Sequence, residues 1–435
     1  MNKILIIITY TLRDEYNELF ENINNEDEVT LIYILNENYL NKISNLRKEF
    51  ILQALKNFKE DLEKKNIYLN IVKELPDIEK YDEIRVEKQF CYDEIKFNQK
   101  IKTKNQINTQ TILDDLDEKI NLDLYTNFRK DVEKKNIYEV VLPKKEITKF
   151  KSIKINSIEL YIKNLNLRFI PSRRNALKHL KEYIWEKELI KTYKQTRNQM
   201  LGNDFSTKFS PYLSLGILSV KEIIFEINKY EEKKIKNSST YWVKFELLWR
   251  EYCKWVSLKF GNKVFLKTGI NDKKIYENYN EEFYKKFISG QTGYYLIDAG
   301  INELIQTGYV SNRVRQNMAS FFVKNLHLPW ILGAEFFEKY LLDYDPASNY
   351  LNWQYIAGCG TDSRDYRYFN LDKQTKTYDS NLEYINTYLK EKSPRIVDFE
   401  KSIEKGKLES QQITTYQQQI FCSKMIPNIY NKVNY

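Results

Sequence analysis

The sequence is poor in cysteine and has no long hydrophobic run. Its four cysteines show no Cys-x-x-Cys spacing; they are Cys91, Cys253, Cys359 and Cys422. This pattern indicates neither a disulfide framework nor a zinc ribbon, and it fits a reducing, intracellular setting. The longest apolar run, residues 4–8, is far shorter than the about 20 residues that a membrane span needs. We therefore expect a buried strand there and no association with a membrane.

Histidine and glycine are also scarce, which excludes several kinds of site. With only His179 and His327, a histidine-rich metal site is excluded and a Ser-His-Asp triad would have to use one of the two. We expect both to be ordinary surface or boundary residues. All 12 glycines lie at or after Gly202, so the first 201 residues contain neither a Walker A loop nor a G-x-G-x-x-G fingerprint. The N-terminal half is therefore no standard nucleotide-binding cradle.

What the chain does have is length and apolar material for packed cores. Its 435 residues, 42% of them hydrophobic, suffice for about two or three domains and exclude wholesale disorder. Near the N-terminus, short β-branched runs alternate with a segment, residues 46–62, whose apolar positions recur every three to four residues. The runs are residues 4–9, 30–35, 67–72 and 84–90. This alternation predicts an α/β domain with a parallel, Rossmann-like sheet over residues 1–125.

Beyond residue 125 the character of the sequence changes twice. Residues 126–170 are polar and lysine-rich, which predicts a connector. Residues 171–390 show helical periodicity almost throughout and predict an all-α domain. Its expected helices are 173–192, 211–229, 240–258, 294–307, 311–326, 333–341 and 346–356. Residues 391–435 carry little signal and form the expected C-terminal tail.

A hydroxyl-rich segment, residues 204–216, leads into one of these predicted helices. Ser210 followed by Pro211 is a favourable helix start, with the serine hydroxyl as N-cap. The hydroxyls of this segment, Lys208 and the unpaired N–H groups of the helix start together could hold a pyrophosphate. A plain capped helix is the alternative, and the segment taken alone favours it.

One predicted helix face combines two indoles with a carboxylate. Trp242, Glu246 and Trp249 follow one another at spacings of four and three residues and so share a face. Such a face could line a ligand pocket, although most aromatic stripes on helices are core. Glu246 is the unusual member, because a carboxylate on an apolar face must find a partner or a proton.

Two later segments offer arginines, amides and acids at helical spacing. Residues 311–317 contain Asn312 and Gln316 one turn apart, together with two arginines whose forked donors suit phosphates or carboxylates. In residues 342–353, Asp345 followed by proline predicts a helix start, and Asn349 and Trp353 lie one turn apart on that helix. The alternative for each segment is a helix cap with a solvated charge pair.

Taken together, these segments resemble the cryptochrome/photolyase family, and most closely its DASH subgroup. The likeness is carried, in family order and at family spacing, by residues 193–198, 206–216, 245–252, 307–324, 341–370, 373–374 and 378–379. Coverage is strong from residue 190 to residue 380 and weak elsewhere. The resemblance implies an N-terminal α/β domain, a helical domain that encloses a U-shaped FAD, and a monomeric protein.

The resemblance also implies which side chains hold FAD. Those expected at its phosphates and ribitol are Tyr193, Ser206, Thr207, Lys208, Phe209 and Ser210. Arg315 and Asp343 would form an ion pair against the isoalloxazine ring, where an arginine favours the anionic reduced form. Asp345 would lie nearby, and the Asn349 amide would face flavin N5.

The activity implied is that of a deoxyribodipyrimidine photo-lyase, which repairs cyclobutane pyrimidine dimers in DNA under blue light. The side chains expected at the flipped lesion are Glu246, Trp249, Arg250, Asn312, Arg313, Gln316 and Tyr355. Glu246, which also counts among the cofactor contacts, would donate a hydrogen bond or proton to the dimer, provided that apolar neighbours keep it protonated. Gln316 and Tyr355 imply a preference for single-stranded DNA. Repair of (6-4) photoproducts is not expected, because that chemistry uses a histidine pair that this chain cannot place in the cavity.

Two parts of the chain depart from the family pattern. Trp353 and Trp330 match the inner and middle members of the three-tryptophan chain that serves photoreduction, but the outer member is missing. Residues 273–287 offer only tyrosines in its place, and we hypothesise that one of them ends the chain; they are Tyr276, Tyr279 and Tyr284. The opening, residues 8–13, is a remnant of the family's start, so a folate antenna (5,10-methenyltetrahydrofolate) is an option without assigned contacts.

Two other functions stay open. One is a blue-light photoreceptor with the same flavin pocket, which signals through its tail or a partner. The other is a non-catalytic binder of single-stranded nucleic acid in which the flavin is structural. Glu246, Trp249, Arg313 and Asn349 argue against the binder, since binding alone needs no carboxylate and amide at the flavin. The short tail without an obvious motif favours repair over signalling, and the net charge of +9 fits salt-dependent binding of a phosphate backbone.

Overall fold

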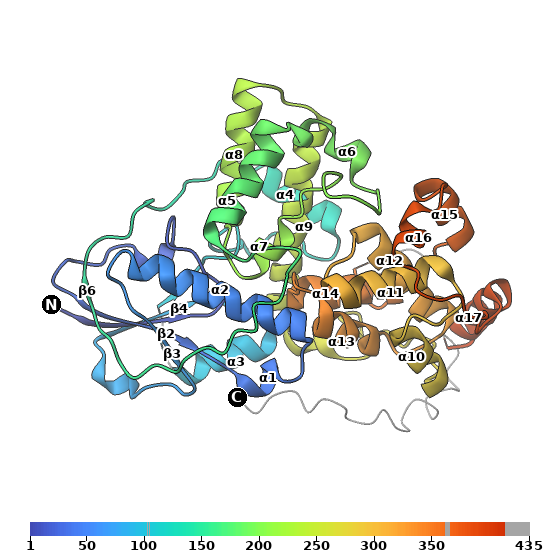
Figure 1. Ribbon diagram of the computed structural model, residues 1–435, viewed down its shortest axis with the longest axis horizontal. Helices are drawn as coiled ribbons and strands as arrows, with labels where there is room; N and C mark the ends of the chain where they lie inside the picture. The colour runs from blue at the N-terminus through green and yellow to red at the C-terminus, as the bar shows by residue number, and fades with distance from the viewer. Residues whose placement is uncertain (102, 104, 362–365, 414–435) are drawn as a thin grey trace. The chain divides into compact units, whose positions relative to one another are not determined.

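A parallel sheet forms the N-terminal part of the chain in a computed structural model that describes residues 1–101, 103, 105–361 and 366–413 (Figure 1). Its strands are β1 (Lys3–Ile8), β2 (Glu28–Ile34), β3 (Leu69–Val72), β4 (Glu83–Glu87) and β5 (Gln106–Ile107), in the order β3-β2-β1-β4-β5. All neighbouring strands are parallel, and the register pairs Leu5 of β1 with Thr30 of β2 and Ile84 of β4. The predicted α/β class is confirmed.

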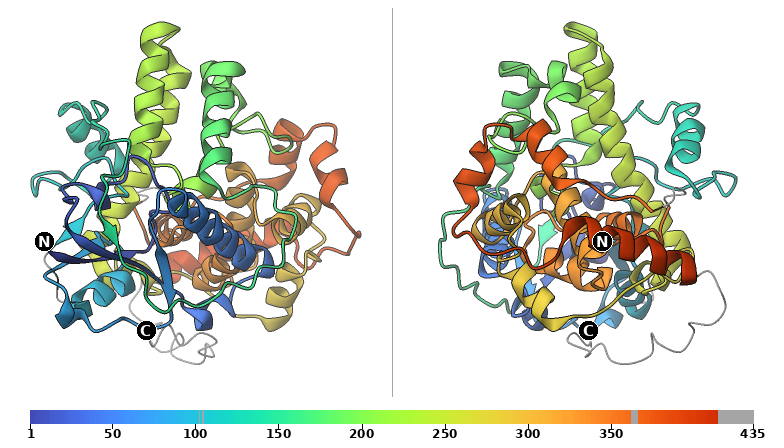
Figure 2. Two further views of the ribbon diagram at one scale, coloured as in Figure 1. Left: turned by 60° about the vertical axis from the view of Figure 1, so that its left-hand side comes forward. Right: turned by 90° about the vertical axis from the view of Figure 1, so that its right-hand side faces the viewer.

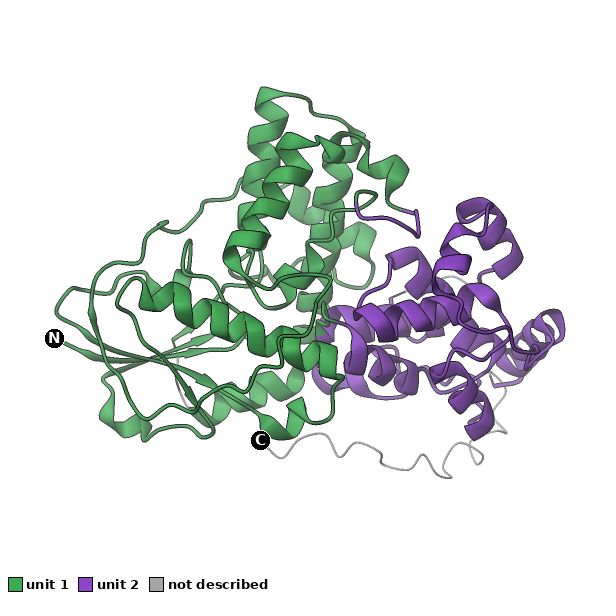
Figure 3. Ribbon diagram, viewed as in Figure 1, with its two compact units in different colours: residues 1–197, 204–259, 342–345 green, residues 198–203, 260–341, 346–435 purple. Residues whose placement is uncertain are grey.

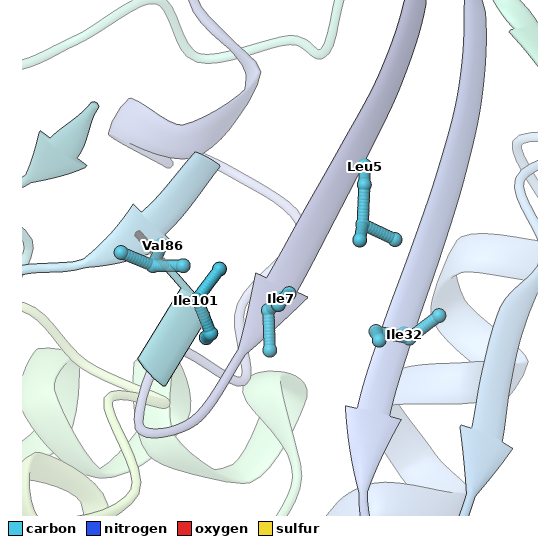
Figure 4. Close-up of a cluster of buried hydrophobic side chains, with 5 residues drawn as sticks. All are labelled: Leu5, Ile7, Ile32, Val86 and Ile101. Atoms are coloured by element: carbon cyan, nitrogen blue, oxygen red, sulfur yellow. The ribbon is translucent and has the colours of Figure 1, made fainter. Parts of the chain in front are cut away.

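Aliphatic side chains from neighbouring strands form the core of the sheet. Leu5 and Ile7 of β1 share one face because successive side chains of a strand alternate, and they cluster with Ile32, Val86 and Ile101 (Figure 4). All five are at most 2% exposed. The continuous apolar run of β1 fits a strand that is covered on both faces.

Helices cover the sheet, and one of them matches the predicted crossover. Helix α1 (Glu37–Leu40) is short, whereas α2 (Asn45–Glu63) lies across one face of the sheet (Figure 2). The hydroxyl of Ser44 caps α2 by accepting from the Arg47 N–H, which fixes where the helix begins. Helix α3 (Tyr92–Ile101) follows β4.

The predicted connector contains regular structure. Helix α4 (Tyr125–Glu133) begins at its boundary, and strand β6 (Lys151–Ser152) pairs in parallel with the start of β2. A two-residue strand in a lysine-rich segment carries no period-2 pattern, so the sequence could not indicate it.

The second half is helical, as predicted. Its helices are α5 (Arg173–Lys181), α6 (Tyr193–Thr196), α7 (Ser210–Ser214), α8 (Val220–Lys233), α9 (Ser238–Phe260), α10 (Glu281–Ile288), α11 (Tyr295–Thr307), α12 (Asn312–Ser320), α13 (Trp330–Tyr340), α14 (Pro346–Ala357), α15 (Leu371–Tyr378), α16 (Glu383–Tyr388) and α17 (Phe399–Ile413). The helix expected over residues 211–229 is divided between α7 and α8, because Gly216 has a φ of +60° and Ser219 starts α8 with a capping box. A side chain at position 216 would overlap the carbonyl oxygen of Tyr10. Of the expected tail, residues 414–435 lie outside the described residues.

The boundary between the two compact units does not coincide with the change from α/β to all-α structure near residue 170. Unit 1 comprises residues 1–197, 204–259 and 342–345, and unit 2 comprises residues 198–203, 260–341 and 346–435 (Figure 3). Helices α5, α7, α8 and α9 therefore belong to the same compact unit as the sheet. Among the described residues, no helix has the length and apolar character needed to cross a membrane.

Candidate functional site

The hydroxyl-rich segment of unit 1 is held in a constrained conformation before α7. Lys208 has a φ of +47° and is only 3% exposed, with its Nζ 3.7 Å from the centroid of the Phe205 ring. Phe209 is the N-cap of α7 and makes no side-chain capping bond. The expectation that Ser210 caps the helix is wrong, because Ser210 is the first helical residue and its Oγ donates instead to Asp343 Oδ2 at 2.6 Å. A left-handed lysine that is nearly fully buried indicates a segment shaped for more than a helix start.

His179 supports this segment from helix α5. Its Nε2 lies 2.7 Å from the carbonyl oxygen of Thr207, and its ring contacts Phe209 at 5.6 Å. Burial lowers the pKa of His179, which favours the neutral ring that donates to a carbonyl. The expectation of an ordinary boundary residue misses this role, since nothing in the sequence links α5 to residue 207.

Glu246 on α9 lies among polar partners, not the apolar neighbours that were expected. Arg197 Nη1 forms an ion pair with Glu246 Oε1, and Trp242 Nε1 donates to the same oxygen at 3.2 Å. The Glu246 side chain is 34% exposed. An arginine partner and solvent both favour the charged carboxylate. The expectation that apolar neighbours keep Glu246 protonated is therefore wrong for this arrangement.

The neighbours of Glu246 on α9 have distinct surroundings. The Trp249 ring makes edge contacts with Tyr125 at 4.8 Å and packs tilted against Tyr252 at 5.7 Å, and it stays partly exposed. Arg250, which was expected at the lesion, donates to the Gln110 carbonyl at 2.6 Å and lies 4.0 Å from Asp345. Its guanidinium is therefore engaged within unit 1.

In unit 2, helix α12 carries the predicted arginines and amides. The Ser311 hydroxyl caps the helix by accepting from the Val314 N–H at 3.4 Å. Arg313 donates to Asn198 Oδ1 at 2.8 Å, and Arg315 donates through Nε to the Val310 carbonyl at 2.9 Å. Asn312 is exposed and Gln316 half-buried, so both amides can reach a ligand.

Helix α14 holds a second group of predicted residues in unit 2. Asn349 is 9% exposed and donates one amide hydrogen to the Ala334 carbonyl at 3.0 Å, which leaves its second hydrogen available. Trp353 packs edge-on against Phe337 at 5.1 Å and Phe322 at 5.7 Å. The Trp353 Nε1 is buried without a hydrogen-bond partner among the described residues. Tyr355 is half-buried.

Trp330, on α13, is more firmly fixed than Trp353. Its Nε1 donates to the Lys267 carbonyl at 3.0 Å, and its ring meets Tyr350 at 6.2 Å. Glu277 accepts from the Trp330 backbone N–H at 3.4 Å, and burial raises the pKa of this carboxyl. Both rings are buried, but the Trp330 indole N–H has a hydrogen-bond acceptor and the Trp353 indole N–H has none among the described residues.

Gly333 leaves the room that Trp353 occupies. A Cβ at this position would overlap the Trp353 six-membered ring. Gly333→Ala is therefore expected to displace the indole and to destabilise the protein by about 1–3 kcal/mol, the usual cost of overpacking a core. Thermal unfolding followed by near-ultraviolet circular dichroism measures both effects. An unchanged midpoint with an unchanged tryptophan signal would contradict the prediction.

The donor set suits the cofactor that the sequence implies. Hydroxyl and ammonium donors for phosphates follow one another on one segment of unit 1, at Ser206, Thr207 and Lys208, and the same unit contains the buried Tyr193. Unit 2 contributes Arg315 and the Asn349 amide, which has a donor to spare. These residues fit FAD, and the mutual geometry of the two groups stays a prediction.

Comparisons with known proteins agree with this chemistry. Residues 242–427 match the family described as the FAD binding domain of DNA photolyase. The cryptochrome DASH of Solanum lycopersicum is 36% identical over 396 residues, which cover 80% of this chain and 69% of that protein. Those of rice and Synechocystis are 48% and 43% identical, over 52% and 62% of this chain, and the chain spans only 39% and 57% of their lengths.

Solved structures extend the likeness to nearly the whole chain. The Synechocystis cryptochrome has a TM-score of 0.84 at 29% identity, covering 94% of this chain and 99% of that one. A bacterial class III photolyase from Agrobacterium tumefaciens has a TM-score of 0.83 at 21% identity, over 95% of this chain and 98% of that one, which shows the shared fold. The sheet, the helical half with its FAD-binding domain and these relatives place the chain in the cryptochrome/photolyase family, in its cryptochrome DASH branch.

Proposed function

We propose that the protein repairs cyclobutane pyrimidine dimers in DNA under blue light, with FAD as cofactor and a preference for single-stranded DNA. The observation that carries the proposal is the partly exposed Glu246 carboxylate, which has the Trp242 indole as hydrogen-bond donor and Trp249 one turn along the same helix. A flipped dimer needs an aromatic wall to recover stacking energy and a polar group for its carbonyls, and this helix face offers both.

The proposal assigns a task to each group of residues. Bound FAD supplies the absorption of light and the electron that opens the dimer. Ser206, Thr207 and Lys208 would hold its phosphates, and the Asn349 amide would offer its second hydrogen to the isoalloxazine ring. Arg313, which also packs 4.8 Å over the Tyr378 ring, and the exposed Asn312 contact the lesion strand.

Glu246 requires a change of partner when a lesion enters. In the structure its carboxylate is paired with Arg197, whose side chain is 25% exposed and can turn toward a DNA phosphate. Release of this arginine would free the Glu246 carboxyl group for the carbonyls of the flipped bases, which exclude water from it.

The proposal includes no folate antenna. Ligands of open parallel sheets bind at the carboxyl ends of the strands where the strand order reverses, which here is between β1 and β4. At those ends Tyr10 donates to Glu94 at 2.5 Å, and the buried Gln110 accepts from the buried Lys254 at 2.9 Å. These side chains are engaged with one another, and the proposal assigns no antenna contacts.

The proposed function predicts light-dependent loss of thymine dimers from ultraviolet-irradiated single-stranded DNA. The measurement uses purified protein with reduced flavin verified by absorbance, and it compares single-stranded with duplex DNA, in light and in darkness. Repair of the single strand alone supports the proposal, and equal repair of both would refute the preference. No repair of either by the flavin-loaded protein would favour the photoreceptor.

A further inference from the structure

Four consecutive residues, 342–345, are each held by a side chain of another part of unit 1. Ser214 donates to the Leu342 carbonyl at 3.3 Å, and Ser210 donates to Asp343 at 2.6 Å. The Arg47 guanidinium lies 4.4 Å from the centroid of the Tyr344 ring. Lys254 Nζ lies 2.6 Å from Asp345 Oδ2. This short segment therefore belongs to unit 1, although the helices on either side of it in sequence belong to unit 2.

The contact between Lys254 and Asp345 is a buried ion pair. The Lys254 side chain is 4% exposed and that of Asp345 is 11% exposed. Lys254 lies one turn after Arg250 on α9, and the Arg250 guanidinium is 4.0 Å from the same carboxylate oxygen. Two cations thus converge on one carboxylate at the edge of the segment that carries Asp343.

Gln110 anchors Lys254 to the sheet. Its side-chain oxygen accepts from Lys254 Nζ at 2.9 Å, and its Nε2 donates to the Lys88 carbonyl at 3.2 Å, directly after β4. The Gln110 carbonyl accepts from Arg250 at 2.6 Å. The position of Asp345 is thereby tied, through one lysine and one glutamine, to the carboxyl end of a buried parallel strand.

We propose that Lys254 is a positioning residue for the flavin site, which sets the segment 342–345 by holding Asp345. The proposal rests on the assignment of Asp343 and Asp345 to FAD. Removal of the ammonium takes the cation at 2.6 Å away from the Asp345 carboxylate and leaves Arg250 at 4.0 Å, so the carboxylate is expected to shift toward that guanidinium or toward water. Either response moves Asp345 and, two residues away, the Asp343 carboxylate that accepts from Ser210.

The test compares Lys254→Met with Lys244→Met. Lys244 is on the same helix and forms a 2.6 Å ion pair with Glu231, with both side chains 7% exposed, so the two variants lose equally buried pairs. FAD dissociation is followed by flavin fluorescence, and the stability of the apoprotein by thermal unfolding. Lys254→Met is expected to weaken FAD binding at least tenfold and to shift the flavin reduction potential, whereas Lys244→Met changes stability alone.

A conservative variant separates positioning from folding. Lys254→Arg keeps the charge and is expected to retain most of the FAD affinity of the wild type. Gln110→Leu removes the anchor but keeps the ion pair, so its FAD affinity is expected to lie between those of Lys254→Met and the wild type. Equal FAD affinity in the two methionine variants, or no recovery with arginine, would overturn the proposal. These readouts do not depend on repair, so a wild-type protein that holds FAD but repairs no dimers would refute only the proposed function.

Discussion

Replacing Glu246 with alanine is expected to lower the rate constant of dimer repair about tenfold to a hundredfold, the range for loss of a hydrogen bond to a charged group. FAD is expected to stay bound, because the segment before α7 and the residues of unit 2 do not depend on Glu246 for their contacts. Glu246→Gln, which keeps a hydrogen-bond donor, should retain most of the activity. The measurement is repair per absorbed photon on irradiated single-stranded DNA, with flavin content read from the visible spectrum.

Glu226 provides a matched control for this substitution. It accepts from Trp185 Nε1 at 2.9 Å, pairs with Lys229 at 2.9 Å and is 26% exposed, so it resembles Glu246 in partners and exposure. Glu226→Ala is expected to leave repair unchanged. If Glu246→Ala repairs as well as Glu226→Ala, the carboxylate has no part in the reaction.

The sequence predicted the architecture because its apolar patterns are local. The β-branched runs of residues 4–9 and 30–35 became β1 and β2, and the periodic segment 46–62 became α2. Helix ends were less predictable where the cause lies elsewhere in the chain. At the break after α7, Gly216 and the Ser219–Glu222 capping box of α8 are local signals, whereas the close approach of the Tyr10 carbonyl to Gly216 is a tertiary contact that no local pattern indicates.

The chemistry of the site was only partly predictable. Spacing placed Glu246 beside Trp242, and their hydrogen bond confirms that the two share a helix face. The partner Arg197 lies 49 residues away along the chain, so the ion pair and the exposed position of the carboxylate could not be inferred. In the same way the sequence assigned Arg250 to the lesion, whereas its contacts with Gln110 and Asp345 are tertiary.

Trp353→Phe is expected to lose most of the light-driven reduction of bound FAD, measured as bleaching of the oxidised flavin band under anaerobic blue light with an external thiol. Phenylalanine preserves the packing against Phe322 and Phe337 but is far harder to oxidise than indole. The Trp353 Nε1–H has no acceptor among the described residues, so the oxidised indole cannot readily lose its proton. A neighbouring donor must therefore reduce the oxidised Trp353 before the electron on the flavin returns to it. A variant that photoreduces as fast as the wild type would refute the whole route.

The surroundings of Trp353 also discriminate among the tyrosines that could end the chain. Phe322 contacts both Trp353, at 5.7 Å, and Tyr284, at 6.4 Å, and Tyr284 lies 6.5 Å from the partly exposed Tyr279. Tyr276 packs on His327 instead, at 5.0 Å. Tyr284→Phe should therefore slow photoreduction more than Tyr276→Phe does. If neither does and Trp330→Phe does, Trp330 supplies the electron that reduces the oxidised Trp353.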